Sequence, residues 1–554
     1  MAESPSEAFK LDQRVHSAGD SRRVGTVKYV GPVEGHGGIW VGVDWDNGEG
    51  KHDGSINGVR YFRAKTERSG SFVRIQSLSG GISLLEGLYV RYRGESTKEE
   101  EDDMYVLSTS NKRVFVELVG MDKIQDKLSR FEELKAASLP YLGISSLGEP
   151  CKISATIPNL KELDLTGNLL SDWKDVGMLC ETLPTLTVLN LSHNLMRKIV
   201  TGMPKLYHLR VLVLNNMGIS WEQVDMLKES LPSIEELHLM GNNISTIEEI
   251  GNHGLAKGVN RWRNYSGSSF VDGGFDSLRL LNLEDNSIAD WEEIVKLSQL
   301  RSLEQIHLNK NKLKQIFYPG NDSISRTLNE YDIHNESFKP FQNLRCLLLG
   351  GNCIEDLESL DSLNYFPKLV DIRLSENPVT DPAKGGVPRF TLVARLARVE
   401  VLNGSEVSTR ERKESEIRYV RLVMSRHSDN PEEMKRLHPR FMELKEIHGI
   451  EDERPSIASA GPKKMSSGLI SITLKCIAAS MGEKPLQTKK LPATTTVGKL
   501  KLLCESIFNM KSTRPKLYLQ EEGSPLPMLL DDDMSSLVDL GIDSSSIILI
   551  DEES

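Results

Sequence analysis

The sequence has few cysteines and no long apolar run. Only six of its 554 residues are cysteine, and none of them forms a C-x-x-C pair. No stretch approaches the ~20 apolar residues that a membrane-spanning helix needs. The first residues, MAESPSEAFK, contain no apolar run of the kind that marks a secretory signal. We therefore expect reduced thiols, no membrane partner and a cytoplasmic location.

An excess of positive charge is also missing. The formal net charge is −11, which argues against nucleic acid as a partner. Apolar residues make up 38% and charged residues 27%, as in folded globular proteins. A chain of 554 residues is too long for one hydrophobic core, so we expect about three or four domains.

The usual sequence marks of catalysis are absent as well. The segment GKHDGS (50–55) resembles a phosphate loop, but Trp45 stands where that loop needs its first glycine, and His52 follows Lys51 where it needs Ser or Thr. His16, His36 and His52 have no cysteine near them, so a zinc site is not supported. Because no nucleophile–base pair emerges either, we predict a binding protein with no cofactor, no metal and no catalytic residue.

The middle of the chain repeats. Eight nine-residue blocks follow the pattern L-x-x-L-x-L-x-x-N, and Met217 is the one departure from the final Asn. A period of about 25 residues is typical of leucine-rich repeats, in which leucines stack inward from short strands. The blocks are LKELDLTGN (160–168), LTVLNLSHN (186–194), LRVLVLNNM (209–217), IEELHLMGN (234–242), LRLLNLEDN (278–286), LEQIHLNKN (303–311), LRCLLLGGN (344–352) and LVDIRLSEN (369–377).

The outward strand positions of these repeats form a mixed surface. They show no row of one charge and no catalytic set, so the pattern indicates a protein-binding face. His238 and His307 recur at one repeat position but lie too many coils apart to share a metal. The candidate residues of this concave face are Asp164, Asn190, His238, Asn282, His307 and Arg373, with Val213 and Leu348 between them.

Both ends of the repeat array carry signs of caps. Ile124, Leu128, Phe131 and Leu134 have helical spacing and predict an N-terminal cap, whereas Ser408 and Glu411 have capping-box spacing before a charged helix. The insertions at 251–277 and 318–340 and the charge run KEEEDD (98–103) predict surface loops.

A separate unit follows the Pro/Ser/Gly/Lys-rich linker at 451–468. Ile470, Ile472 and Leu474 alternate as in a strand, and Thr496 precedes a helix with Val497, Leu500, Cys504 and Ile507 on one face. With the later strands KLYLQ and SSIILID, this order resembles a ubiquitin-like β-grasp domain. The sequence ends in Asp551-Glu552-Glu553-Ser554 without the Gly-Gly that conjugation requires, so we interpret this unit as a docking module.

The N-terminal module combines glycines, aromatic residues and local positive charge. Between Gly50 and Gln76 there are six Lys/Arg and two Asp/Glu, which favours an acidic partner. Aromatic side chains nearby favour a partner that also carries an aromatic or apolar group. The candidate residues for binding it are Trp40, Trp45, Gly50, Lys51, His52, Asp53, Gly54, Tyr61 and Phe62.

The stretch RVGTVKYVG…GIWVGVDWDNGEGKHDGSINGVRYF…GSFV closely resembles a CAP-Gly domain. The loop of that family is usually Gly-Lys-Asn-Asp-Gly, and the family binds acidic C-terminal tails ending in Glu-Glu-Tyr or similar, as on α-tubulin. Gly50, Lys51, Asp53 and Gly54 match this motif, whereas His52 stands in place of the Asn. An imidazole can still donate one hydrogen bond to a carboxylate.

The order CAP-Gly, leucine-rich repeats and ubiquitin-like domain resembles that of the tubulin-folding cofactor E family over nearly the whole chain. The resemblance implies a cytoskeleton-associated chaperone that takes α-tubulin from one tubulin-folding cofactor, joins it to β-tubulin held by another, and also separates heterodimers. The predicted fold is multidomain: an all-β CAP-Gly domain (1–80), a connector with the N-terminal cap (81–145), an α/β leucine-rich-repeat solenoid (146–450), the linker (451–468) and a ubiquitin-like domain (469–554).

Two other functions stay open at this stage. One is a microtubule-associated CAP-Gly adaptor, although such proteins commonly add basic stretches or coiled coils and no heptad run is visible here. The other is a repeat adaptor for proteasome or ubiquitin-pathway proteins, which rests on the C-terminal domain alone.

Overall fold

A computed structural model describes most of the chain in two compact units, one ending at Asn286 and one beginning at Ser287. The described residues are 9–93, 105–107, 113–115, 130–197, 204–247, 275–319, 340–426, 431–450, 469–478, 482, 484–510, 514–520, 527–530, 533, 536–537, 540, 542 and 546–552. The loop KEEEDD, the linker 451–468, most of both insertions, and Ile124 and Leu128 lie outside the described residues.

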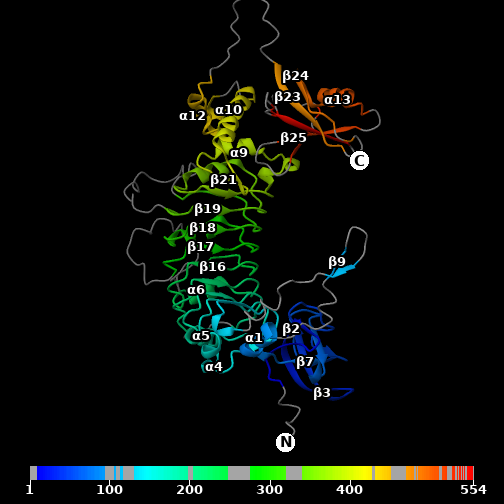
Figure 1. Cartoon of the computed structure of the whole chain (residues 1–554), viewed down its shortest axis with the longest axis vertical. Coiled ribbons are helices and arrows are strands. Elements are labelled where there is room, and N and C mark those ends of the chain that lie inside the picture. Colours follow the sequence, from blue (N-terminus) through cyan, green and yellow to red (C-terminus); the bar gives the residue numbers. More distant parts are fainter. Residues whose placement is uncertain are drawn as a thin grey trace, which may run out of the picture. The chain divides into compact units, whose positions relative to one another are not determined.

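The N-terminal module is a small antiparallel β-structure (Figure 1). Apolar residues alternate along its long strands, so one face of the sheet buries Val15, Val27, Val41 and Val43. A second, two-stranded sheet pairs β4 (Ser55–Ile56) with β5 (Val59–Arg60) beside residues 50–54. The strands are β1 (Arg14–Ser17), β2 (Asp20–Val33), β3 (His36–Trp45), β4 (Ser55–Ile56), β5 (Val59–Arg60), β6 (Gly70–Val73) and β7 (Leu78–Ser79), and the five-stranded sheet has the order β6-β3-β2-β1-β7.

The segment after this module covers the start of the repeats. Strand β8 (Ile82–Ser83) pairs in parallel with β12 (Ile144–Ser146), and helix α1 (Leu84–Arg93) buries Leu84 and Leu88 completely. Of the N-terminal cap that we expected on residues 124–134, the structure describes Phe131 and Leu134, which are buried and lie in and just after a short 3-10 helix, η2 (Phe131–Glu133). The rest of that prediction lies outside the described residues. Strands β9 (Tyr105–Leu107) and β10 (Arg113–Phe115) form a hairpin.

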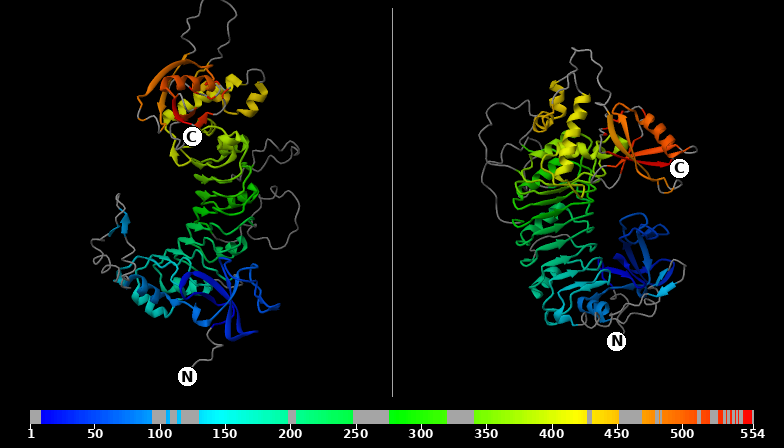
Figure 2. Two further views of the ribbon diagram at one scale, coloured as in Figure 1. Left: turned by 90° about the vertical axis from the view of Figure 1, so that its right-hand side faces the viewer. Right: turned by 45° about the horizontal axis from the view of Figure 1, so that its top comes forward.

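Short parallel strands form one side of the repeat coils (Figure 2). In each strand the middle residue is buried and its two neighbours are not, so the first and third residues face outward. The first unit holds β11 (Ala136–Ser138), β13 (Glu162–Asp164), β14 (Val188–Asn190), β15 (Val211–Val213), β16 (Glu236–His238) and β17 (Leu280–Asn282) in chain order; the second holds β18 (Gln305–His307), β19 (Cys346–Leu348), β20 (Asp371–Arg373) and the hairpin β21 (Val401–Leu402) and β22 (Ser405–Glu406).

Helices follow the strands in most coils. Asp172, Ser220, Asp290 and Asp356 cap four of them through their side chains, which satisfies backbone N–H groups that a helix start leaves free. The helices are α4 (Pro150–Thr156), α5 (Trp173–Thr182), α6 (Trp221–Lys228), α7 (Trp291–Val295) and α8 (Leu357–Ser362), with the 3-10 turns η4 (Lys296–Gln299), η5 (Leu363–Tyr365), η6 (Pro378–Thr380) and η7 (Pro382–Lys384).

Asparagine side chains join neighbouring coils. Asn242 donates through Nδ2 to the carbonyls of Leu214 (2.8 Å) and Leu239 (2.9 Å), while its Oδ1 accepts from the backbone of Met217 (2.9 Å) and Ile219 (3.2 Å). Equivalent residues repeat these contacts, so the expected ladder is confirmed. The ladder is interrupted at Met217, whose thioether cannot donate, and Oδ1 of buried Asn194 in the preceding coil has no partner within the described residues.

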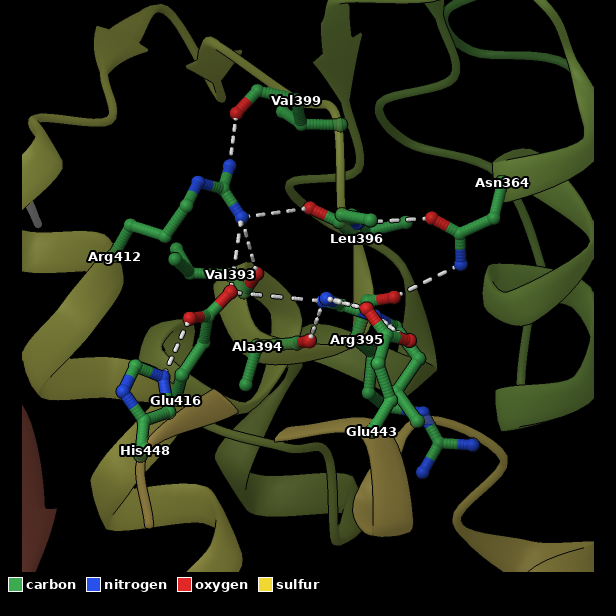
Figure 3. Close-up of polar contacts among 12 residues, drawn as sticks. Asn364, Val393, Ala394, Arg395, Leu396, Val399, Arg412, Glu416, Glu443 and His448 are labelled. Carbon is green, nitrogen blue, oxygen red and sulfur yellow. Dashed lines mark hydrogen bonds and ion pairs between the residues drawn. The ribbon is translucent and has the colours of Figure 1, made fainter. Parts of the chain in front are cut away.

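The second unit closes its repeats with four helices: α9 (Arg389–Arg395), α10 (Thr409–Arg426), α11 (Pro431–Leu437) and α12 (Phe441–Ile447). Arg412 donates to the carbonyls of Val393 and Leu396, both at 3.0 Å, and to that of Val399, while Arg440 reaches the carbonyl of Ala394 (Figure 3). These cations satisfy carbonyl groups that the end of α9 leaves without helical partners.

Buried ion pairs complete this C-terminal cap. Arg395, which is 2% exposed, pairs with Asp361 of α8 and contacts the hydroxyl of Tyr419 at 3.2 Å. Burial raises the pKa of Asp361, against the effect of the neighbouring Arg395, and raises that of Tyr419 to about 12. Glu416 accepts from His448 at 2.9 Å (Figure 3).

The predicted cap of α10 forms only in part. Ser408 Oγ accepts from the backbone of Glu411 at 3.0 Å, as its spacing predicts. The Glu411 carboxylate, however, does not reach back to Ser408; it pairs with the buried Arg389 at 2.7 Å, because that cation needs a counter-charge there.

The C-terminal domain has the β-grasp fold, as predicted, with helix α13 (Val497–Phe508) on one face of a five-stranded sheet (Figure 1). Its strands β23 (Leu469–Cys476), β24 (Gln487–Pro492), β25 (Pro515–Gln520), β26 (Met528–Leu530) and β27 (Ile547–Glu552) have the order β24-β23-β27-β25-β26. Thr496 caps α13 (Val497–Phe508), and Val497, Leu500, Cys504 and Phe508 are buried while Ile507 is only partly so. All six cysteines are free thiols.

We predict that Asn242→Ala lowers the free energy of unfolding by at least about 2 kcal/mol, because the change leaves buried backbone groups of two coils without partners. Denaturant unfolding monitored by circular dichroism measures the change. Lys174→Ala, at an exposed position of α5, is the control and should stay within about 0.5 kcal/mol of the parent. Equal midpoints for the two variants would contradict the role given to the ladder.

A second prediction concerns the C-terminal cap. Arg395→Met should cost about 3–5 kcal/mol, since it leaves the Asp361 carboxylate buried without its cation. The double change Arg395→Met with Asp361→Leu should recover much of that loss, because no buried charge remains. Thermal and denaturant unfolding of the two variants decide the matter: a double variant that is no more stable than the single one would show that the ion pair is not the cause.

Candidate functional site

The loop at 50–54 is held rigidly against strand β6. The backbone N–H groups of Lys51 and His52 donate to the carbonyl of Gly70 at 2.6 and 3.1 Å, and Gly70 N–H returns a bond to His52 at 2.8 Å. Gly54 has φ +98°, and a Cβ there would lie 2.2 Å from the carbonyl oxygen of Phe62. Glycine is needed at this position for both reasons, so the loop can take one compact shape.

His52 supports the loop with one ring nitrogen. Its Nδ1 accepts a hydrogen bond from the N–H of Gly54 at 3.0 Å, which places the ring proton of the neutral form on Nε2. Burial lowers the pKa of His52, Lys51 lowers it further, and Asp53 opposes both. No contact of Nε2 is found among the described residues, so this N–H remains for a ligand.

The two charged residues of the loop differ in what they can offer. Asp53 is bound to Arg60 at 2.7 Å and accepts from the backbone of Ser55 at 3.1 Å. The bond from Arg60 holds the pKa of Asp53 below its usual value, so this carboxylate is ionised and already paired. Lys51 is exposed and forms no ion pair within the described part of the chain. Lys51 is therefore the loop's free cation.

Aromatic rings line the face beside the loop. The ring of Phe72 lies 5.1 Å from that of His52 and 5.4 Å from those of Tyr61 and Phe62, and Tyr29 lies 5.2 Å from Tyr61. Distances of this size are typical of edge-to-face and tilted ring contacts. The structure thus brings His52 and Tyr61, which the sequence predicted, together with Tyr29 and Phe72, which it did not. Phe62, also predicted, is buried behind them at 7% exposed.

The two tyrosines of this face use their hydroxyl groups differently. Tyr29 donates to the carbonyl of Pro32 at 2.6 Å, whereas Tyr61 accepts from the backbone N–H of Glu34 at 2.9 Å. A phenol that accepts in this way still has its own proton to donate. Tyr61 therefore adds a third unused donor to Nζ of Lys51 and Nε2 of His52.

The two predicted tryptophans lie on opposite faces of β3. Trp40 is on the same side as Phe72 and carries the guanidinium of Arg74 at 3.8 Å above its ring. Trp45 is 2% exposed and packs in the core with Val41 and Val43, under the guanidinium of Arg23 at 4.6 Å. The prediction that Trp45 contacts a ligand is wrong, because side chains alternate along a strand and its odd position faces inward.

Several predicted residues of the concave face form hydrogen bonds within their own coil. Oδ1 of Asp164, Asn190 and Asn282 accepts from the backbone N–H two residues later at 3.0, 3.0 and 2.9 Å. Arg373 Nε donates to Ser375 at 3.1 Å, and His238 lies 3.5 Å from Glu236. His307 has the same position in β18. Polar residues at the third strand position thus close the turn that follows, which limits what they offer a partner.

None of the described helices combines the length and the apolar character that a bilayer crossing requires. No group of three or more His, Cys, Asp or Glu side chains in the described part of the chain is placed to hold a metal ion.

Comparisons with known proteins identify the class of protein to which this chain belongs. Residues 11–78 match the family model described as the CAP-Gly domain, which together with the repeats and the β-grasp domain makes this a multidomain CAP-Gly protein. The chain is 59% identical over 554 residues to "Tubulin-folding cofactor E" of Arabidopsis thaliana, covering 100% of both chains. It is 30% identical over 545 residues to "Tubulin-specific chaperone E" of Danio rerio, covering 95% of this chain and 96% of the relative.

The chain therefore belongs to the tubulin-folding cofactor E family, whose members are named tubulin-specific chaperones. Among solved structures, the C-terminal ubiquitin-like domain of mouse tubulin-specific chaperone E is similar at 21% identity, covering 17% of this chain and 96% of that one with a TM-score of 0.15.

We predict that His52 titrates below 6.5, its ordinary value, because burial disfavours the charged ring. Since the folded pKa lies below the unfolded one, the stability that His52 contributes is present above pH 6.5 and is lost as the pH falls through the folded pKa. NMR titration of the ring C–H signals measures this value, and the protection factor of the Gly54 amide against hydrogen exchange should fall as the pH is lowered through the same range. A midpoint at or above 6.5 would show that burial does not dominate the pKa of His52.

Proposed function

We propose that the chain is a tubulin-folding chaperone that binds α-tubulin and promotes assembly of the α/β-tubulin heterodimer and, in reverse, its dissociation. The acidic C-terminal tail of α-tubulin binds the loop at 50–54, and the body of the subunit binds the repeats. The observation that carries this proposal is the set of three unclaimed donors, on Lys51, His52 and Tyr61, around one aromatic face.

The chemistry of these donors suits a peptide terminus. A carboxylate has four lone-pair directions, and charge-assisted bonds to it are about twice as strong as neutral ones. The rings of Phe72, Tyr61 and Trp40 offer apolar surface for an aromatic side chain beside that carboxylate. A basic loop also draws acidic tails by long-range attraction, which raises the rate of encounter.

A tail peptide alone buries little surface, so a second contact is needed for the folded subunit. Stable interfaces bury about 1,200–2,000 Å², and a curved repeat face can supply that area. Tail capture then raises the effective concentration of the subunit at the repeats. The other cofactors of tubulin folding are the partners that deliver α-tubulin and hold β-tubulin. In this mechanism the chain acts by binding tubulin and catalyses no reaction. We place this activity in the cytoplasm.

Lys51→Ala should weaken binding of an α-tubulin tail peptide by about 1.5–3 kcal/mol, the worth of one charge-assisted bond. A peptide shortened by its last residue should lose affinity to a similar degree. Calorimetric titration measures both, with Lys10→Ala as a control that removes an exposed charge of the same module outside the loop. Unchanged titrations for the variant and the shortened peptide would refute tail capture at this loop.

A further inference from the structure

A connection of two residues, Gly80 and Gly81, joins the N-terminal module to the first coil of the repeats, which contains β11, β12 and α4. Before the connection, β7 pairs with β1 of the module. After it, β8 pairs in parallel with β12, and Ile82 donates through its backbone N–H to the carbonyl of Gly143 at 2.9 Å. Both sides of the connection are therefore hydrogen-bonded into sheets, which leaves two residues in place of a flexible linker.

The backbone at this connection is closely packed. Gly81 has φ +91°, and a Cβ there would lie 2.3 Å from the carbonyl oxygen of Gly143. Gly143 has φ +73°, and a Cβ there would lie 2.6 Å from Nε2 of His16 in β1 of the module. Both positions need glycine, because other residues rarely adopt these angles and no space is left for a side chain. The backbone of the first coil thus lies directly against a side chain of the module.

A second contact joins another strand of the module to the same coil. The guanidinium of Arg22 in β2 lies 5.4 Å from the centre of the Tyr141 ring, within the range of cation–π attraction. That ring lies where a Cβ on Gly167 would be only 2.1 Å from it, and its centre is 6.5 Å from that of the His193 ring. The backbone N–H of Tyr141 also donates to the carbonyl of Thr166 at 2.9 Å. Two strands of the module therefore contact one turn of the first coil.

Helix α1 fixes the segment that follows the connection. It begins directly after β8, and its Leu84 and Leu88 are fully buried. Near its end, the hydroxyl of Tyr92 accepts from the backbone N–H of Ser138 in β11 at 2.9 Å. Because β8 and α1 are packed as part of the first coil, the module is attached within two residues of an anchored element.

We propose that the N-terminal module and the first coil form one rigid body, so that the loop at 50–54 has a fixed position relative to the repeats and a tail captured there holds α-tubulin in one orientation. The statement about tubulin rests on the proposed function, whereas the rigid body does not. A module on a flexible linker would raise the local concentration of the subunit but leave its orientation free. A fixed module lowers the ordering cost of the second contact, because the two sites are already arranged.

The variant that tests the rigid body has a flexible Gly/Ser segment of about twelve residues between the two glycines of the connection. It also carries His16→Ala and Arg22→Ala, which remove the module's side of both contacts. We call it the freed variant. The matched control carries the same segment between Ser110 and Asn111, in the connection between β9 and β10, and leaves the joint intact. Circular dichroism checks that the full-length parent and both variants are folded.

Spin labels measure how widely the module moves. They are attached at Glu67→Cys in the module and Lys174→Cys on α5, both exposed positions, after Cys151, Cys346 and Cys353 have been replaced with Ser. Double electron–electron resonance should give one narrow distance distribution in the parent and the control. The freed variant should give a distribution at least about twice as wide, because a flexible linker lets its module sample many positions. Equal widths in all three chains would refute the rigid body.

Tubulin binding tests the fixed orientation. The freed variant should bind an α-tubulin tail peptide within about twofold of the parent, since its loop is unchanged. It should bind the intact tubulin heterodimer at least about fivefold more weakly, because its module must then be ordered on binding. The control should match the parent in both measurements.

The outcomes keep the two proposals apart. If the parent binds neither the tail peptide nor tubulin, the proposed function fails, and the spin-label distances still decide the rigid body. If the freed variant binds tubulin as tightly as the parent, or if the control is weakened as much as the freed variant, the fixed orientation is refuted while the proposed function stands.

Discussion

The satisfaction of backbone groups at the turn of every coil is the constraint on which the repeats depend. Each coil ends its strand by turning away from the sheet, and that turn leaves buried N–H and C=O groups that cost free energy without partners. An Asn amide supplies both a donor pair and an acceptor from one short side chain, and Asn242, Asn286 and Asn352 use them in the same way. Because these bonds reach the preceding coil, they set how neighbouring strands register.

Strand register in turn decides what the outer surface offers. With the coils locked together, the first position of each strand lies directly beside the first position of the next, as Val188 lies beside Val211. A row such as Glu162–Val188–Val211–Glu236 can form only because no strand slips. The third positions are partly engaged, since Asp164 and Asn190 already accept bonds from the turns that follow their strands.

Close backbone packing has a comparable role in the N-terminal module. The loop at 50–54 lies against β6 and Phe62 with no space for a Cβ on Gly54, so its side chains point in defined directions. His52 shows the consequence. Its Nδ1 accepts a hydrogen bond from the N–H of Gly54, and its Nε2 has no partner among the described residues. The proposed function depends on hydrogen-bond donors of this kind, which the fold holds in place but does not pair with its own acceptors.

Much of this could be predicted from sequence because the signals are local and repeated. The eight L-x-x-L-x-L-x-x-N blocks required only the period to be noticed, and Thr496 and Ser408 act as caps because capping depends on residues within one helical turn. Failures came where the signal was short or the context distant. Trp45 was expected to contact a ligand, but its position on the inward face of β3 places it in the core.

The sequence by itself determined the kinds of domain, their order, the basic character of the loop, and both the ladder asparagines and their interruption at Met217. Only the tertiary structure decided which side chains of those segments are free. Trp45 and Phe72 are both aromatic residues of strands, yet one is in the core and the other lies beside His52 of the loop at 50–54. Asp53 and Glu162 are both acids, yet one is paired with Arg60 and the other is exposed. The physical reason is that exposure and hydrogen-bond partners come from residues distant in the chain, whereas periodicity and capping depend on neighbours.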